Sequence, residues 1–103
     1  MSSTSTLRER LQNLLSTSNK LGEDLLDLVI EFTQNVHRVD MYNVFNKQLQ
    51  KTEIKHKTDV YEALANTMDI IWAGNTGQAE IYSTVLTDED FAAREASRKI
   101  FGR

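Results

Sequence analysis

Residues 21–39 read LGEDLLDLVIEFTQNVHRV, and this stretch decides the fold. Apolar side chains recur in it at spacings of four, three and four residues, which places them along one face of an α-helix. These side chains are Leu21, Leu25, Leu28 and Phe32. Val29 and Ile30 are also apolar and lie off this face, so the helix must be covered on more than one side. We interpret the stretch as helical core, covered either by its own chain or by another copy.

The apolar pattern extends from this stretch in both directions. It begins at Leu7 and continues through Val36 and Val39 to Leu49. The pattern predicts one long amphipathic helix over residues 7–50. Residues 16–22 contain Ser, Thr, Asn and Gly, which are poor helix formers, and a break there is the alternative. An unbroken helix would be roughly 66 Å long at the α-helical rise per residue, so it would bend or project toward a partner.

The rest of the chain predicts shorter helices. Residues 1–6 are expected to be a frayed leader, with Thr6 and Glu9 forming a capping box at the start of the long helix. A second helix is predicted over residues 58–73, followed by a turn that begins at Gly74. Residues 78–86 fit a short helix, although their β-branched content would also suit a strand. Residues 88–101 form a helix with Thr87 as its cap and acids in its first turn. The fold class is therefore all-α: an elongated helical hairpin or a small helical bundle with a long N-terminal helix, oligomeric, in one domain over residues 1–103.

Composition sets broad limits on function. The chain has 103 residues, no cysteine, no proline and a formal net charge of −3. Without cysteine there is no disulfide framework, zinc knuckle or thiol nucleophile. No apolar run is long enough to cross a membrane, and the first residues do not read as a secretory signal. We expect a cytoplasmic protein, or an intravirion protein if the source is a virus, with no membrane partner.

Residues that could carry catalysis are few. Glu53 and His56 have the spacing of half a di-iron carboxylate site, but the chain has no second copy of that motif. His37 is better explained as a hydrogen-bonded boundary residue than as a general base. No nucleophile elbow or phosphate-binding loop is present in the sequence. We expect no catalytic residues, no cofactor and no metal, so the protein is predicted not to be an enzyme.

Two charged stripes are predicted on the long helix. Lys47, Lys51 and Lys55 are spaced by four residues and would form a basic stripe if helix persisted there. An acidic stripe has the same spacing, at Glu23, Asp27 and Glu31. The two stripes would attract each other within a hairpin or between two copies. Solvated faces with incidental spacing are the simpler interpretation.

Two hypotheses for function remain open. The first is a non-enzymatic helical interaction or assembly protein, a small subunit or scaffold, such as a viral or phage structural or accessory protein, that binds itself or another protein. The second is a small regulator that contacts nucleic acid, or an enzyme that acts on it, through residues 47–57 and the basic C-terminal tail. The predicted interaction residues are Leu21, Leu25, Leu28, Val29, Phe32, Val36, Val39, Lys47, Lys51, Lys55, Phe91 and Phe101. The last helix carries a thin alanine stripe, so we expect it to be the most mobile or partner-dependent element.

Overall fold

The structure is a computed structural model. It describes residues 3–74, 81, 82 and 87–101, except for the side chains at positions 94 and 97–101. Within these residues it contains six helices and no strand, which confirms the all-α fold class. The helices are α1 (Ser3–Thr17), α2 (Leu21–Phe32), α3 (Arg38–Leu49), α4 (Thr52–Lys55), α5 (Thr58–Ala73) and α6 (Asp88–Phe101).

The long helix predicted for residues 7–50 is wrong, because α1, α2 and α3 are separate helices. The first break is the alternative that the sequence offered. Ser16 and Thr17 donate their hydroxyl groups to the carbonyl oxygens four residues earlier, which competes with a continuing helix. Ser18 then donates to the carboxylate of Asp24 at 2.5 Å and accepts from the N–H of Lys20 at 3.2 Å. These bonds hold the chain where α2 begins.

The second break, at residues 33–37, was not predicted. Thr33 donates its hydroxyl to the carbonyl of Ile30, and the N–H of Val36 still reaches the carbonyl of Phe32. His37 is extended, with φ −62° and ψ 150°, and its Nδ1 accepts from the N–H of Val39 at 3.2 Å. The imidazole therefore caps α3, which lets the chain reverse and lay α3 against the helices before it.

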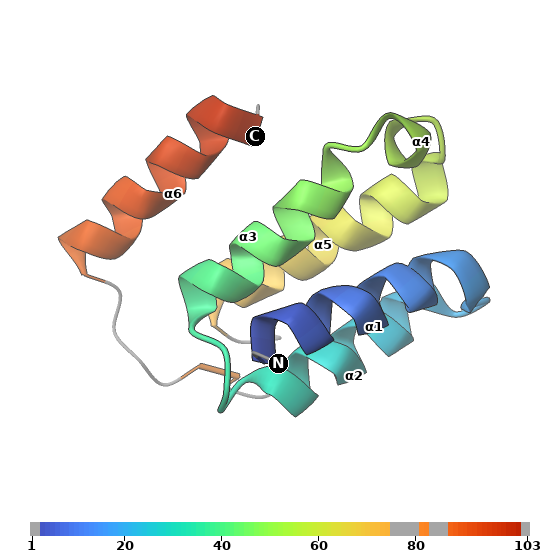
Figure 1. Ribbon diagram of the computed structural model, residues 1–103, viewed down its shortest axis with the longest axis horizontal. Coiled ribbons are helices and arrows are strands. Elements are labelled where there is room, and N and C mark those ends of the chain that lie inside the picture. Colours follow the sequence, from blue (N-terminus) through green and yellow to red (C-terminus); the bar gives the residue numbers. More distant parts are fainter. Residues whose placement is uncertain (1–2, 75–80, 83–86, 102–103) are drawn as a thin grey trace.

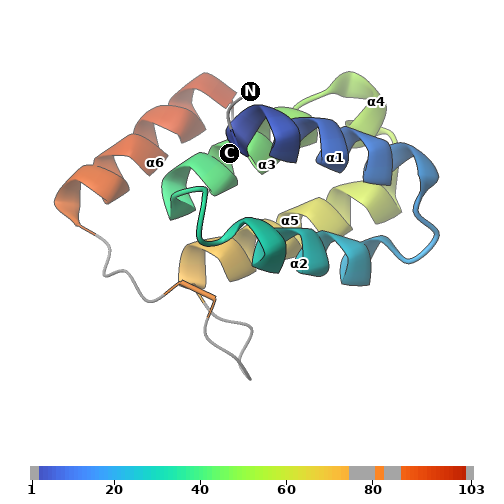
Figure 2. The same ribbon diagram turned by 60° about the horizontal axis from the view of Figure 1, so that its bottom comes forward.

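The helices pack into one rounded body (Figure 1), with principal extents of 35 × 32 × 29 Å and a radius of gyration of 13.0 Å. That radius is the size expected for a compact chain of this length, so the elongated hairpin is wrong and the small bundle is correct. Helices α3 and α5 lie side by side at the centre, α1 and α2 cover them, and α4 closes the end where α3 turns into α5. In the rotated view of Figure 2, α6 still lies at the edge, beside α3.

The core draws on all five helices from α1 to α5. Its described members have almost no exposed surface, and the Leu25, Phe45 and Leu64 side chains are fully buried. The other members of this cluster are Leu7, Leu11, Leu28, Val29, Phe32, Val36, Met41, Tyr42, Val44, Leu49, Ile54, Met68, Ile71 and Tyr82. Most apolar residues of the segment 21–39 are therefore covered by their own chain, but Ile30 remains 53% exposed.

The ends of the other elements differ in part from the prediction. Helix α1 begins at Ser3, so residues 3–6 are helical rather than a frayed leader, and Thr6 lies inside the helix. Helix α5 ends at Gly74, whose φ of 80° is left-handed, as the predicted turn requires. The short helix predicted for residues 78–86 lies mostly outside the described residues. Ile81 and Tyr82 are described and are not helical, since both of their N–H groups donate to the carbonyl of Gly74.

Candidate interaction surface

The apolar residues predicted to bind a partner are used inside the fold. Leu25 and Val29 have no exposed surface, and Leu28 exposes 2%. Phe32, Val36 and Val39 are also buried, and Leu21 is partly buried against the core. Helix α2 packs this apolar surface against α1 and α5. These apolar residues are thus covered without a second copy, whereas Ile30 of the same helix is exposed.

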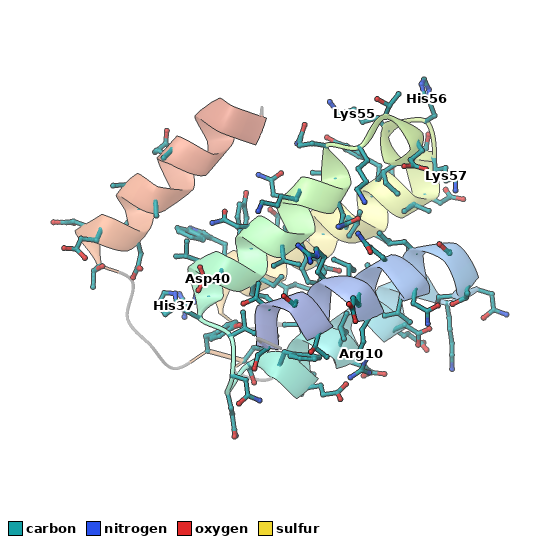
Figure 3. The ribbon with its side chains drawn as sticks, viewed as in Figure 1. Arg10, His37, Asp40, Lys55, His56 and Lys57 are labelled. Carbon is teal, nitrogen blue, oxygen red and sulfur yellow. The ribbon has the colours of Figure 1, made fainter. Side chains whose placement is uncertain are left out.

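Lysines gather at one end of the molecule. Lys47 lies on α3, Lys51 precedes α4, Lys55 ends α4, and Lys57 precedes α5. All four are exposed. They do not form a stripe on one helix, because the chain turns twice between residues 50 and 57. Instead the turns wrap them around a corner, where Figure 3 shows Lys55, His56 and Lys57 projecting outward. We call Lys47, Lys51, Lys55, His56 and Lys57 the basic corner.

Among the described residues, no ion pair joins the predicted acidic stripe to the basic corner. Instead Glu31 pairs with Arg10 of α1 at 2.5 Å. The Arg10 guanidinium also lies 5.6 Å from the centre of the Phe32 ring. The hydrogen bond from Arg10 lowers the pKa of Glu31. This exposed pair joins α1 to α2, and surface pairs of this kind contribute little to stability.

A groove lies beside the basic corner, between α1 and α4. Its volume is about 280 Å³. Its lining residues are Gln12, Leu15, Ser16, Gln48, Lys51, Glu53, Ile54 and Lys57. Gln48 exposes only 3% of its surface and lines this groove from α3. We call this feature the Gln48 groove.

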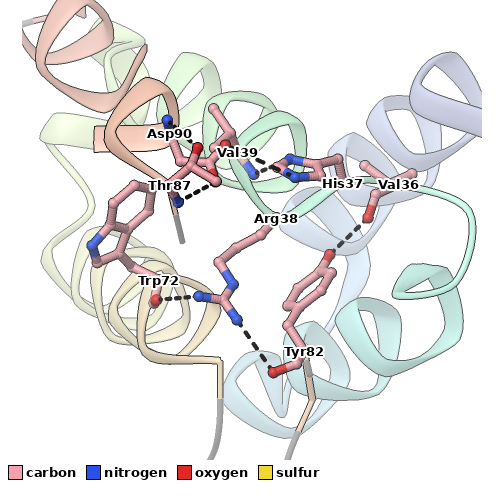
Figure 4. Close-up of polar contacts among 8 residues, drawn as sticks. All are labelled: Val36, His37, Arg38, Val39, Trp72, Tyr82, Thr87 and Asp90. Carbon is pink, nitrogen blue, oxygen red and sulfur yellow. Dashed lines mark hydrogen bonds and ion pairs between the residues drawn. The ribbon is translucent and has the colours of Figure 1, made fainter. Parts of the chain in front are cut away.

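A buried arginine joins three segments at the other end of α3 (Figure 4). Arg38 exposes 6% of its surface. Its guanidinium donates to the carbonyl of Trp72 at 3.4 Å and to that of Tyr82 at 3.2 Å. It also lies 5.4 Å from the centre of the Tyr82 ring. These bonds satisfy carbonyls at the end of α5 and beyond it, so the role of Arg38 is structural.

Tyr82 and Gly74 complete this junction. The Tyr82 hydroxyl donates to the carbonyl of Val36 at 2.9 Å, and burial raises the pKa of Tyr82 to about 12, with Arg38 opposing the shift. A Cβ on Gly74 would lie 2.6 Å from the Arg38 Nη2 atom. The junction therefore requires glycine both for its left-handed φ and for the close approach of the guanidinium.

His37 connects the starts of two helices. Its Nδ1 caps α3, and its Nε2 lies 4.0 Å from a carboxylate oxygen of Asp90 in α6. Asp90 also accepts from the N–H of Thr87 at 2.9 Å, while the Thr87 hydroxyl accepts from the N–H of Asp90 at 3.2 Å. These two bonds are a reciprocal capping box. The hydrogen bond from the Thr87 N–H lowers the pKa of the Asp90 carboxyl, and the Thr87 hydroxyl and the charges of His37 and Arg38 lower it further.

Helix α6 lies against α3, and most of its described side chains are exposed. Phe91 meets Trp72 edge to face, with ring centres 5.7 Å apart, and remains 49% exposed. The other exposed residues of α6 are Asp88, Glu89, Ala92, Ala93, Glu95 and Ala96. Phe101 ends α6, and its side chain is outside the described residues. The first turn of α6 thus presents two carboxylates and half of a phenyl ring to solvent.

Arg38 and Gln48 were not predicted as functional residues, although their positions in the sequence contain a signal for both. Their positions fall on the same face of α3 as Met41, Phe45 and Leu49, at helical spacings from those residues. Polar residues on an apolar face are the ones that need a partner when buried. Arg38 has its carbonyl acceptors, and Gln48 is a lining residue of the groove.

No group of three or more His, Asp or Glu side chains suited to a metal ion occurs among the residues the structure describes. In the same part of the chain, no helix is long and apolar enough to cross a membrane. No protein-family model, curated protein or solved structure matches this chain. The function must therefore be argued from the surface.

Proposed function

We propose that this chain is a non-enzymatic helical assembly protein, a small subunit that binds copies of itself or another protein. The observation that carries the proposal is the unequal use of apolar surface. Helices α1 to α5 close one core and leave Ile30 of α2 exposed, while α6 leaves Phe91 and its alanines exposed. A helix that is well capped but barely packed has a face available for another molecule.

The exposed charges indicate how that contact would be made. The basic corner lies at the end where α3 leads into α4, and the acids of α6 lie where α3 begins. Complementary charge gives an interface specificity and speed of association more than affinity. The chain is thus suited to a contact that salt weakens, rather than to a wide apolar interface.

The direct test is the mass of the purified chain, measured by sedimentation over a wide range of concentration at low and high salt. We expect association that grows with concentration and weakens with salt. An apolar assembly would keep its mass at high salt. A chain that stays monomeric throughout, and that binds no defined protein partner, would contradict the proposal.

Contact with nucleic acid is the second candidate, and the exposed basic corner is what favours it. The net charge of −3 and the presence of Glu53 in the groove oppose it. Its test is the binding of labelled duplex and single-stranded oligonucleotides at several salt concentrations. Tight binding that falls steeply with salt, and that Lys51→Glu abolishes, would favour this candidate over protein assembly.

A further inference from the structure

The Gln48 groove has the properties of a site for a peptide segment. Gln48 is one of its lining residues, and a side-chain amide can both donate and accept a hydrogen bond. Gln12 and Ser16 contribute further polar groups from α1, and Leu15 and Ile54 supply apolar surface. A ligand that entered the groove would therefore find hydrogen-bonding groups beside an apolar patch.

The chemistry of the lining selects an acidic peptide over a phosphate. Two cations, Lys51 and Lys57, face one carboxylate, Glu53, so the lining is net positive. An amide both donates and accepts, as a peptide group does. A fully ionised phosphate could only accept, so it would offer no donor to the Gln48 carbonyl oxygen. A peptide with an acidic side chain can satisfy the lysines and the amide together.

We propose that this groove binds the acidic first turn of α6, residues 87–91, from a second copy of the chain. The inference rests on the assembly function proposed above and names the contact that produces it. Asp88 and Glu89 are exposed, and Phe91 is half exposed beside them. The turn thus offers two carboxylates and an apolar ring to a groove that carries two lysines and an apolar patch.

The two surfaces cannot meet within one molecule. The contact between His37 and Asp90 holds the acidic turn at the start of α3. Lys51 lies beyond the far end of α3, which is about 18 Å long at the rise of an α-helix. Figures 1 and 2 both show the start of α6 and helix α4 at opposite ends of the body. Complementary surfaces at opposite ends favour contact between copies.

Such a contact is head to tail. Each chain carries one groove and one acidic turn, so every bound copy leaves one of each unused. A contact of this kind produces a closed ring or an open filament instead of a two-fold dimer. This property makes the inference testable with a mixture of two variants.

The experiment uses one variant with the groove reversed, Lys51→Glu with Lys57→Glu, and another with the turn reversed, Asp88→Lys with Glu89→Lys. Alone, each variant should self-associate at least about tenfold more weakly than the natural chain, because like charges then meet. When mixed, the groove variant still has an intact turn and the turn variant an intact groove. The reversed groove of one variant also complements the reversed turn of the other, so the mixture should regain the association of the natural chain, as measured by sedimentation.

The controls reverse exposed charges away from both surfaces. Arg8→Glu with Lys20→Glu matches the groove variant in charge, and Asp27→Lys with Glu62→Lys matches the turn variant. Both should associate as the natural chain does, and circular dichroism should show that all four variants are folded. Because the chain has no cysteine, Gln12→Cys and Glu89→Cys chains provide a second measurement, since an oxidised mixture should form a disulfide between the two.

Four outcomes would overturn the inference. If the natural chain assembles and neither charge-reversed variant is weakened, assembly stands but the groove is not its site. If both are weakened but their mixture associates no more strongly than either variant alone, the two surfaces do not bind each other. If the natural chain is monomeric at every concentration yet binds another protein, this self-contact is wrong while the docking function stands. If it is monomeric and binds nothing, both proposals fail.

Discussion

Helices α2 and α6 are stabilised in opposite ways. Helix α2 has no side-chain cap at its start, yet Leu25, Leu28, Val29 and Phe32 are buried against α1 and α5. Helix α6 has a reciprocal capping box and acids in its first turn, yet no described side chain in it is fully buried. Local signals determine that a helix forms, whereas apolar area determines how firmly it is held. The difference explains why the core is closed and why α6 keeps a free face.

Truncating one apolar side chain in each helix gives the largest expected contrast. Leu25→Ala should lower the free energy of unfolding by about 3 kcal/mol, because it leaves a cavity in a fully buried site. Phe91→Ala should lower it by no more than about 1 kcal/mol, because the ring is half exposed and makes one recorded aromatic contact. Urea denaturation followed by circular dichroism measures both. Equal losses would mean that α6 is part of the core.

The junction around Arg38 separates these two regions, and a double-mutant cycle tests it. Gly74→Ala should cost about 1–3 kcal/mol, from the left-handed backbone and from the contact with the guanidinium. Arg38→Met should cost about 2 kcal/mol, because the carbonyls of Trp72 and Tyr82 lose a donor. The double variant should cost clearly less than the sum, since methionine removes the group that the alanine meets. Strictly additive losses would show that the close approach is not what requires glycine.

The sequence was sufficient to predict the helical class, the core residues of the segment 21–39 and the capped start of α6. Apolar spacing identified Leu25, Leu28 and Phe32 as core, and Thr87 accepts from Asp90 as a capping residue should. It was not sufficient for the break at residues 33–37. The apolar spacing continues through Val36 and Val39, and only the hydrogen bonds of His37 show that the helix stops.

The candidate site was less predictable than the fold. Lys47, Lys51 and Lys55 were chosen as a stripe on one helix, and the residues between them turn the chain instead. The Gln48 groove depends on α1 lying near α4, although these helices are far apart in the chain. Spacing along one helix contains no information about such a contact. Whether α2 is covered by its own chain or by a second copy also depends on how the other helices pack.

The smallest effect is expected from acid, and it concerns α6 alone. Asp90 has a lowered pKa in the folded chain, because the ionised carboxylate accepts from Thr87 and lies near His37. Its contribution to holding α6 is therefore present above the ordinary carboxyl pKa and is lost as the pH falls through the lowered pKa. We expect α6 to leave the core in this acidic range while α1 to α5 keep their helical signal.

Trp72, the only tryptophan, reports this step by fluorescence because Phe91 lies against it. Asp90→Asn should remove the step, since an asparagine carbonyl accepts at every pH. If fluorescence and helical signal instead fell together, and at the same pH in the Asp90→Asn chain, α6 would be held as firmly as α2 and the contrast between them would fail.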